Sequence, residues 1–273
     1  MNEHTYELPP DYHSHTRLCK HADGEPADYV RMAEAAGIAE FACTDHCPAP
    51  FTYDPEHRMA LEEFDQYRQW VAQAQADSGL RVLFGVEADY HEGCEEYLDD
   101  FLRKQEFDVV LGSVHYASFN PRRAPSLKGL WNHPDPRTNW AIYLDRIGRL
   151  ADTGLYDVVG HLDLPKRFGG VPQAEWMEEL MPPILDRIAK AGMAIEINTS
   201  GINHLPKEPY PSLPVLTMAH ARNIPITFGS DAHSPVQVGQ HFEEAVALAR
   251  RAGYTHSLRF QGRRGTPVLI PGA

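Results

Sequence analysis

The sequence predicts a single α/β domain, residues 1–273, built as a TIM-like barrel with seven parallel strands, one short of the usual eight. Its length of 273 residues is ordinary for one barrel domain. Short apolar runs rich in Val, Ile and Phe alternate with stretches of helical periodicity. Histidine and acidic residues recur where the apolar runs end, and the carboxyl ends of barrel strands are where active sites lie.

The apolar runs predict six buried parallel strands, and a weaker first strand is expected around residues 8–15. The six runs are residues 38–44, 81–88, 107–115, 156–162, 193–198 and 224–230. Seven helices are predicted between and after them. The helix at 26–37 opens with Pro and closes with Gly, as helices often do, and 62–79 has apolar residues at helical spacing. The others are expected at 94–104, 137–152, 175–191, 212–222 and 239–252.

Residues 117–136 form a Pro-rich stretch without periodicity that carries Arg122, Arg123 and Lys128. A loop of this length is commonly a lid, a binding loop or a disordered segment. Here it is the expected source of substrate specificity.

The composition argues against several classes of partner. A formal net charge of −13 argues against a large nucleic-acid surface, which needs a basic stripe. Apolar runs are too short to cross a bilayer, and the first residues lack a secretory pattern, so a cytoplasmic protein is expected. Four cysteines are expected to be free thiols; Cys43 and Cys47 flank a TDH motif and are expected to be small buried residues rather than ligands. The sequence makes no prediction of oligomeric state.

Six separate segments deliver metal-ligating residue types to the predicted strand ends. In a parallel barrel these ends meet on one face, so the side chains should converge. Buried ionisable groups that converge without partners are costly, and metal coordination satisfies them. The residues are His13, His15, Asp45, His46, Glu87, His115, His161, Asp231 and His233.

Local spacing indicates which of these side chains face inward. Residues i and i+2 of a strand share a side, so His13 and His15 can hold one ion. Asp45 and His46 are adjacent and should point to opposite sides, and we choose His46 as the ligand. Asp163, two residues after His161, could orient a neighbouring ligand. This many histidines and carboxylates implies two or three ions, and the residue types suit zinc, iron or manganese.

The remaining histidines have weaker claims. His133 lies in the long loop and could reach a substrate, and His204 follows the sixth apolar run. The others are expected on the surface: His57, His91, His220, His241 and His256.

The strings HSHT, TDH, GVE, GSVHY, GHLDL, EINTSG and GSDAH together resemble the polymerase-and-histidinol-phosphatase (PHP) superfamily, from about residue 11 to 240. The longer strings are similar to its histidinol-phosphatase branch. The resemblance implies a distorted seven-stranded barrel, three divalent metal ions (Zn, Fe or Mn) and three ligand sets. These are His13, His15, Glu87 and Asp231; His21, His46 and His233; and Glu87, as a bridge, with His115 and His161. His21 enters through the resemblance alone.

The resemblance also implies hydrolysis of L-histidinol phosphate, a small phosphorylated substrate, by a metal-bridging hydroxide. Arg167 is our choice for the cation that binds phosphate, since a guanidinium grips phosphate with two hydrogen bonds. Its neighbour Lys166 is the alternative, and Asn198 and Ser200 are candidates for binding the rest of the substrate. The leaving group could be protonated by a metal-bound water, by Asp231 or by His233.

Two other functions stay open at this point. One is a phosphoesterase or exonuclease of the same superfamily that acts on nucleotides, which Arg122 and Arg123 slightly favour. The other is a non-catalytic, metal-binding regulatory protein on the same barrel, which would bind metal without turnover.

Overall fold

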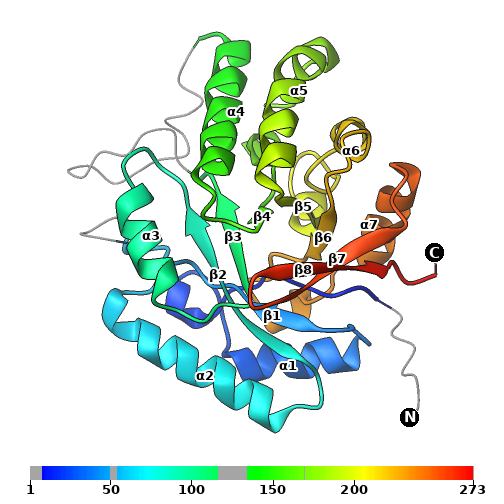
Figure 1. The fold of residues 1–273 in the computed structure, drawn as a ribbon. Coiled ribbons are helices and arrows are strands. Elements are labelled where there is room, and N and C mark those ends of the chain that lie inside the picture. Colours follow the sequence, from blue (N-terminus) through cyan, green and yellow to red (C-terminus); the bar gives the residue numbers. More distant parts are fainter. Residues whose placement is uncertain (1–7, 50–53, 116–133, 169, 273) are drawn as a thin grey trace.

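A computed structural model describes residues 8–49, 54–115, 134–168 and 170–272. Six parallel strands form one curved sheet in which each strand lies beside the next one along the chain (Figure 1). The strands are β1 (Phe41–Cys43), β2 (Val82–Asp89), β3 (Val109–Ser113), β4 (Val158–Val159), β5 (Ala194–Asn198) and β6 (Ile226–Gly229). All six predicted parallel strands are therefore confirmed; five have narrower bounds, and β2 is shifted by one residue.

The segment expected to be the first strand, residues 8–15, joins the two edges of this sheet. Asp11 makes a parallel bridge with Phe41 of β1, and Ser14 makes one with Ala232, just after β6. These isolated bridges occupy the place of a seventh strand but do not form a regular one. Pro9 and Pro10 have no amide N–H to donate, which explains why this ladder is broken. The expectation of a distorted TIM-like barrel is thereby confirmed, with isolated bridges in place of the expected first strand, and its seam lies at the segment that carries His13 and His15.

In the described residues, seven α-helices lie around the outside of the sheet (Figure 1). Each lies within three residues of its predicted bounds, because apolar periodicity and terminal signals both mark it. Asp135, for example, accepts hydrogen bonds from the Arg137 and Thr138 amides at the start of α4, and Gly154 ends that helix with a left-handed φ of 67°. The helices are α1 (Pro26–Ala35), α2 (Phe64–Asp77), α3 (Glu95–Arg103), α4 (Pro136–Thr153), α5 (Ala174–Ala191), α6 (Leu213–His220) and α7 (Phe242–Arg251).

A C-terminal hairpin that the sequence analysis did not predict covers the amino ends of the barrel strands. Its strands are β7 (His256–Gln261) and β8 (Arg264–Leu269). Phe260 packs in one cluster with Tyr12 and with the first residues of β3, β4 and β5. Arg263 pairs with Asp157 at 3.0 Å. The hairpin therefore closes this end of the barrel and leaves the carboxyl ends for chemistry.

Parts of the sequence prediction lie outside the described residues. These are His133 and most of the 117–136 loop, including Arg122, Arg123 and Lys128. The four cysteines are free and buried, as expected. In the described part of the chain, no helix has the length and apolarity needed to span a membrane.

Candidate metal centre

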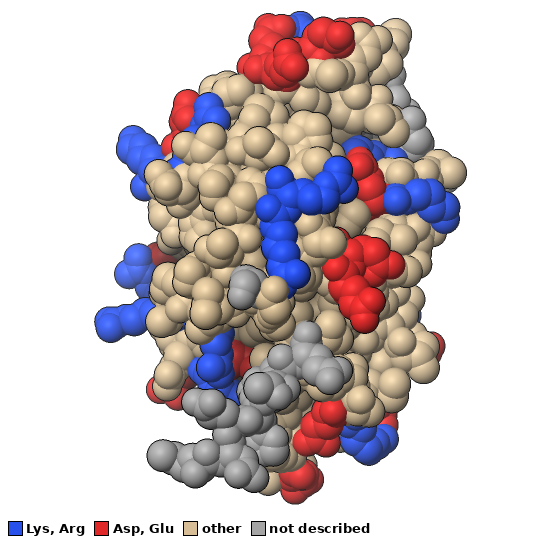
Figure 2. Space-filling model, turned by 90° about the vertical axis from the view of Figure 1, so that its right-hand side faces the viewer, with Lys and Arg blue, Asp and Glu red and all other residues tan. Residues whose placement is uncertain are grey.

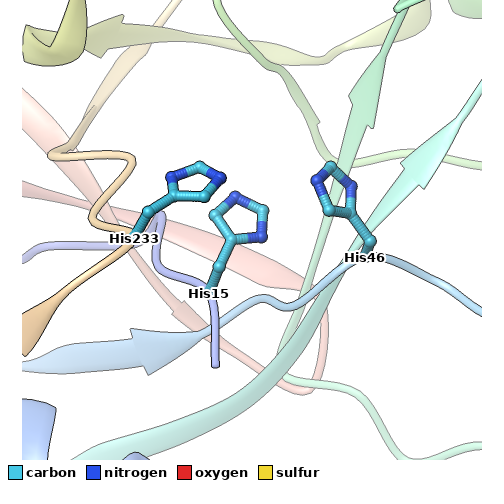
Figure 3. A group of neighbouring side chains, drawn as sticks. All are labelled: His15, His46 and His233. Carbon is cyan, nitrogen blue, oxygen red and sulfur yellow. The ribbon is translucent and has the colours of Figure 1, made fainter. Parts of the chain in front are cut away.

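The carboxyl ends of the strands bring histidines from distant segments together. Figure 3 shows the rings of His15, His46 and His233 side by side, carried respectively by the seam segment, the turn after β1 and the turn after β6. One ring nitrogen from each lies within 4.8 Å of the others. The convergence expected from the parallel topology is thus present.

His13, His15 and Asp231 form a second such group. Asp231 Oδ1 lies 3.1 Å from His15 Nε2 and 3.6 Å from His13 Nε2. The carboxylate therefore faces both nitrogens of the HSH motif across the seam of the barrel.

Glu87, on β2, lies between several histidines. Its Oε2 is 3.4 Å from His13 Nε2 and 3.0 Å from His46 Nδ1. Its Oε1 is 3.0 Å from His161 Nε2 and 3.5 Å from His115 Nε2. One carboxylate is thus placed to serve two sides of the cluster, in keeping with the bridging role that the family resemblance implied.

His21 and His233 meet at the more exposed side of the cluster, with their Nε2 atoms 3.0 Å apart. Their Nδ1 atoms each lie 2.9 Å from a backbone carbonyl oxygen, that of Cys19 for His21 and that of Asp231 for His233. An Nδ1–H donated to a carbonyl leaves Nε2 with a free lone pair, which is the form that binds metal. His46 lies nearby, its ring centroid 5.4 Å from that of His21.

Asp45 and His46 point to different sides, as the strand argument expected. Asp45 is fully buried and accepts a hydrogen bond from the Thr16 amide at 3.1 Å, whereas His46 faces Glu87. Asp163 differs from expectation: it pairs with Lys166 at 2.8 Å and accepts from the Ser212 amide, rather than orienting a histidine.

Two acidic residues that the sequence analysis missed lie behind the histidines. Glu196 Oε1 is 2.6 Å from His13 Nδ1, and Asp89 Oδ1 is 2.6 Å from His115 Nδ1. A signal for both was present in the sequence. Asp89 lies two residues after Glu87, and Glu196 two before Asn198, so each shares an inward face with a candidate site residue.

Several buried ligand atoms in this cluster have no hydrogen-bond partner among the described residues. They include His13 Nε2, His46 Nδ1 and Glu87 Oε2. Leaving such atoms unsatisfied is costly, and a divalent cation between imidazoles and a carboxylate satisfies them. The donor set therefore fits a metal centre.

The ionisation of the cluster also favours cations. Burial would raise the pKa of Glu87, but His115 and His13 hold that pKa well below its usual range. Burial lowers the pKa of His46 to about 4 and that of His233 to about 3. For His15, burial is outweighed by the hydrogen bond with Asp231 and by the nearby carboxylate of Asp45, which raise its pKa to about 9. His15 thus holds a proton that a metal ion would displace.

Backbone strain is concentrated at two of these residues. His161 has a φ of 21° and Asp231 a φ of 53°, both in the left-handed region that residues with a side chain rarely adopt. Strain of this kind persists at sites where function requires a particular side-chain direction.

The residues expected to bind substrate divide into two kinds. Asn198 and Ser200 are buried beside Asp231: Ser200 Oγ lies 3.2 Å and Asn198 Nδ2 lies 3.4 Å from its Oδ2. Lys166 is buried and pairs with Asp163 and Glu208, each at 2.8 Å, while its neighbour Arg167 is exposed.

The burial of the remaining histidines agrees only partly with the sequence prediction. His220 and His256 are exposed, as expected, but His91 is buried in the turn after β2. His57 Nδ1 lies 2.7 Å from Asp54 Oδ1. The ring of His57 also lies against that of His21, with 5.1 Å between the ring centroids. His204 is partly buried, which lowers its pKa.

Two surface features lie away from the cluster. A cavity of about 480 Å³ is lined by α4 and the turn after β2, including Tyr90 and Arg146, and by none of the nine expected ligands. On the described part of the face in Figure 2, Lys and Arg form small groups separated by uncharged and acidic surface, so that face carries no continuous basic stripe.

Comparisons with known proteins agree with this fold. Residues 11–200 match the model of the PHP domain family, and residues 214–250 match that of the PHP-associated family. The chain is 35% identical to a probable histidinol-phosphatase of Deinococcus radiodurans, over 94% of this chain and 98% of that protein. It is 26% identical to the histidinol-phosphatase of Bacillus subtilis, over 85% and 96% respectively.

A solved structure shares the fold. It is histidinol phosphate phosphatase from Lactococcus lactis, complexed with zinc, L-histidinol and phosphate, and it matches with a TM-score of 0.81 at 22% identity, covering 95% of this chain and 99% of that one. The chain therefore belongs to the PHP domain family.

Proposed function

We propose that this protein is a metal-dependent histidinol-phosphatase, which hydrolyses the phosphomonoester of L-histidinol phosphate to L-histidinol and phosphate. The observation that carries the proposal is the set of buried, unpartnered ligand atoms around Glu87, in a chain similar over almost its whole length to a probable histidinol-phosphatase. A small phosphorylated substrate, a cytoplasmic location and no nucleic-acid partner belong to the same proposal.

The proposed metal centre holds three divalent ions, Zn, Fe or Mn. When bound, such ions supply a nucleophile at neutral pH and stabilise charge on phosphoryl oxygens. The ligand sets are those that the family resemblance implied: His13, His15, Glu87 and Asp231; His21, His46 and His233; and Glu87 with His115 and His161. The distances among Glu87, His115 and His161, and between His21 and His233, support these groupings.

Arg167 is the proposed phosphate-binding residue. It is exposed, and its charge acts on His204 and Tyr210 beside the cluster. Lys166 is the weaker candidate because its ammonium is already buried between Asp163 and Glu208.

Asn198 and Ser200 have a second proposed role besides binding substrate. They hold Asp231 Oδ2 by hydrogen bonds, so that Oδ1 faces His13 and His15. Asp231 and His233, two of the three candidate proton donors to the leaving alkoxide, lie at the open side of the cluster, where the substrate would enter. Burial lowers the pKa of His233 to about 3, and His13 and His15 hold the pKa of Asp231 well below its usual range, so neither keeps a proton at neutral pH. The third candidate, a metal-bound water, is therefore the proposed donor, and the two side chains would position it.

The test combines elemental analysis with assays on a panel of phosphate esters. We expect bound metal and a preference for L-histidinol phosphate over nucleotides and over p-nitrophenyl phosphate. In His15→Ala, metal content and phosphatase activity should both fall. His256→Ala, which removes an exposed histidine of the terminal hairpin, should retain both. A preference for nucleotides would show that the proposed substrate is wrong. Bound metal without turnover of any ester would indicate a regulatory protein.

A further inference from the structure

Glu196 occupies an unusual place inside the barrel. It lies on β5 between Ala194, which packs in the apolar cluster behind the hairpin, and Asn198, which contacts Asp231. Its side chain is 1% exposed. A carboxylate at this depth needs several hydrogen bonds to offset the loss of water.

Every contact of Glu196 is with a donor. Oε1 lies 2.6 Å from His13 Nδ1. Oε2 accepts from the His161 amide N–H at 2.8 Å and from Asn198 Nδ2 at 3.1 Å. An ionised carboxylate is the one side-chain group of this shape that only accepts hydrogen bonds.

The contact with His13 determines which of its nitrogens can bind metal. If Nδ1 carries the proton that it donates to Glu196, Nε2 has a free lone pair. That Nε2 is buried, without a hydrogen-bond partner among the described residues, 3.4 Å from Glu87 and 3.6 Å from Asp231.

The contact with His161 acts through the backbone. His161 has the strained φ of 21°, and its amide is held by Glu196 while its ring Nε2 lies 3.0 Å from Glu87 Oε1. Holding the amide fixes the turn that directs this ring toward Glu87.

The neighbouring strand leaves room for the carboxylate. Gly229 of β6 faces it, and a Cβ atom at that position would overlap Glu196 Oε1 and approach His13 Cβ to 2.6 Å. The close approach of Glu196 and His13 therefore requires glycine at residue 229.

We propose that Glu196 is a positioning residue that prepares two ligands beside Glu87, His13 through its ring and His161 through its backbone. This inference rests on the proposed metal centre. Carboxylates behind metal-bound histidines fix the tautomer and raise ligand basicity, and their loss typically costs about 10–100-fold in metal affinity.

The experiment is Glu196→Gln, which keeps the shape but presents an NH₂ group to donors. We expect the affinity for zinc, and separately for manganese, to fall about 10–100-fold in competition with a chromophoric chelator. The matched control is Asp157→Asn at the opposite end of the barrel, where the carboxylate accepts from the Val110 amide and pairs with Arg263. This control should lower stability but leave metal affinity unchanged.

The outcomes separate the two proposals. If the wild-type protein binds no metal, the proposed function fails. If wild type binds metal and Glu196→Gln binds it within twofold as tightly, the role of Glu196 is refuted. Should the variant not fold, ¹⁵N-histidine NMR of the zinc-loaded wild type decides: we expect the His13 proton on Nδ1, and a proton on Nε2 would overturn the inference.

Discussion

In the metal-free protein, the free energy of unfolding should decrease as the pH rises from 6.5 to 9. In the metal-free fold, the hydrogen bond with Asp231 and the nearby carboxylate of Asp45 outweigh burial and raise the pKa of His15 from 6.5 to about 9. A group whose pKa is raised by folding stabilises the fold fully below its unfolded pKa, and this contribution is lost as the pH passes through the folded pKa. The difference between 6.5 and about 9 corresponds to about 3 kcal/mol.

The assay is urea unfolding of chelator-treated protein between pH 6 and 9, with zinc-loaded protein beside it. Buried thiols such as Cys43 have a raised pKa and also reduce stability as the pH approaches 9, so His15→Asn is measured in parallel to subtract this shared effect. The zinc-loaded protein should show a weaker loss, because metal displaces the proton from His15. If the free energy of unfolding of metal-free wild type, relative to His15→Asn, is flat or rises over this range, the reasoning is refuted.

Three further predictions concern single side chains. Asp89→Asn should lower the free energy of unfolding by about 3 kcal/mol, because it removes the buried carboxylate charge 2.5 Å from the buried Arg58, which keeps a longer ion pair with Asp54 at 3.6 Å and its hydrogen bond to the Cys47 carbonyl. Urea unfolding measures this, and a change below about 1 kcal/mol would contradict it. Phe260→Ala should lower the free energy of unfolding by about 3–5 kcal/mol, because it opens a cavity in the barrel. Leu269→Ala, at an exposed position of the same hairpin, should change it by less than about 0.5 kcal/mol. Equal effects in urea unfolding would show that the hairpin does not close the barrel. Arg167→Ala should lower kcat/KM for L-histidinol phosphate about 10–100-fold and leave the metal content unchanged. A loss of metal in this variant would show that Arg167 supports the metal centre instead of binding phosphate.

Most of the fold could be predicted because each strand and helix carries its own periodicity. The terminal hairpin was missed although Leu258 and Phe260 alternate with polar residues and Gly262 and Arg263 form its turn with positive φ. It is antiparallel and half-exposed, so it lacks the continuous apolar run that marked the parallel strands.

The candidate metal ligands could be proposed because strand order alone brings the strand ends to one place. The role of Glu196 could not, because it depends on which residues of the neighbouring strands face it. The same holds for Lys166 and Arg167, which are adjacent in sequence. Only the packed structure shows that the first is buried between two carboxylates and that the second is exposed.

The seam of the barrel has a consequence for the order of folding. The segment that carries His13 is synthesised well before β6, yet Ser14 bridges Ala232, which follows β6. Contacts between residues so distant in sequence form late, since the entropy of closing the intervening loop must be met first. His13 and Asp231 therefore come together only after β6 exists. On a growing chain the ligand cluster would be among the last features completed, so metal uptake would report that the barrel has closed.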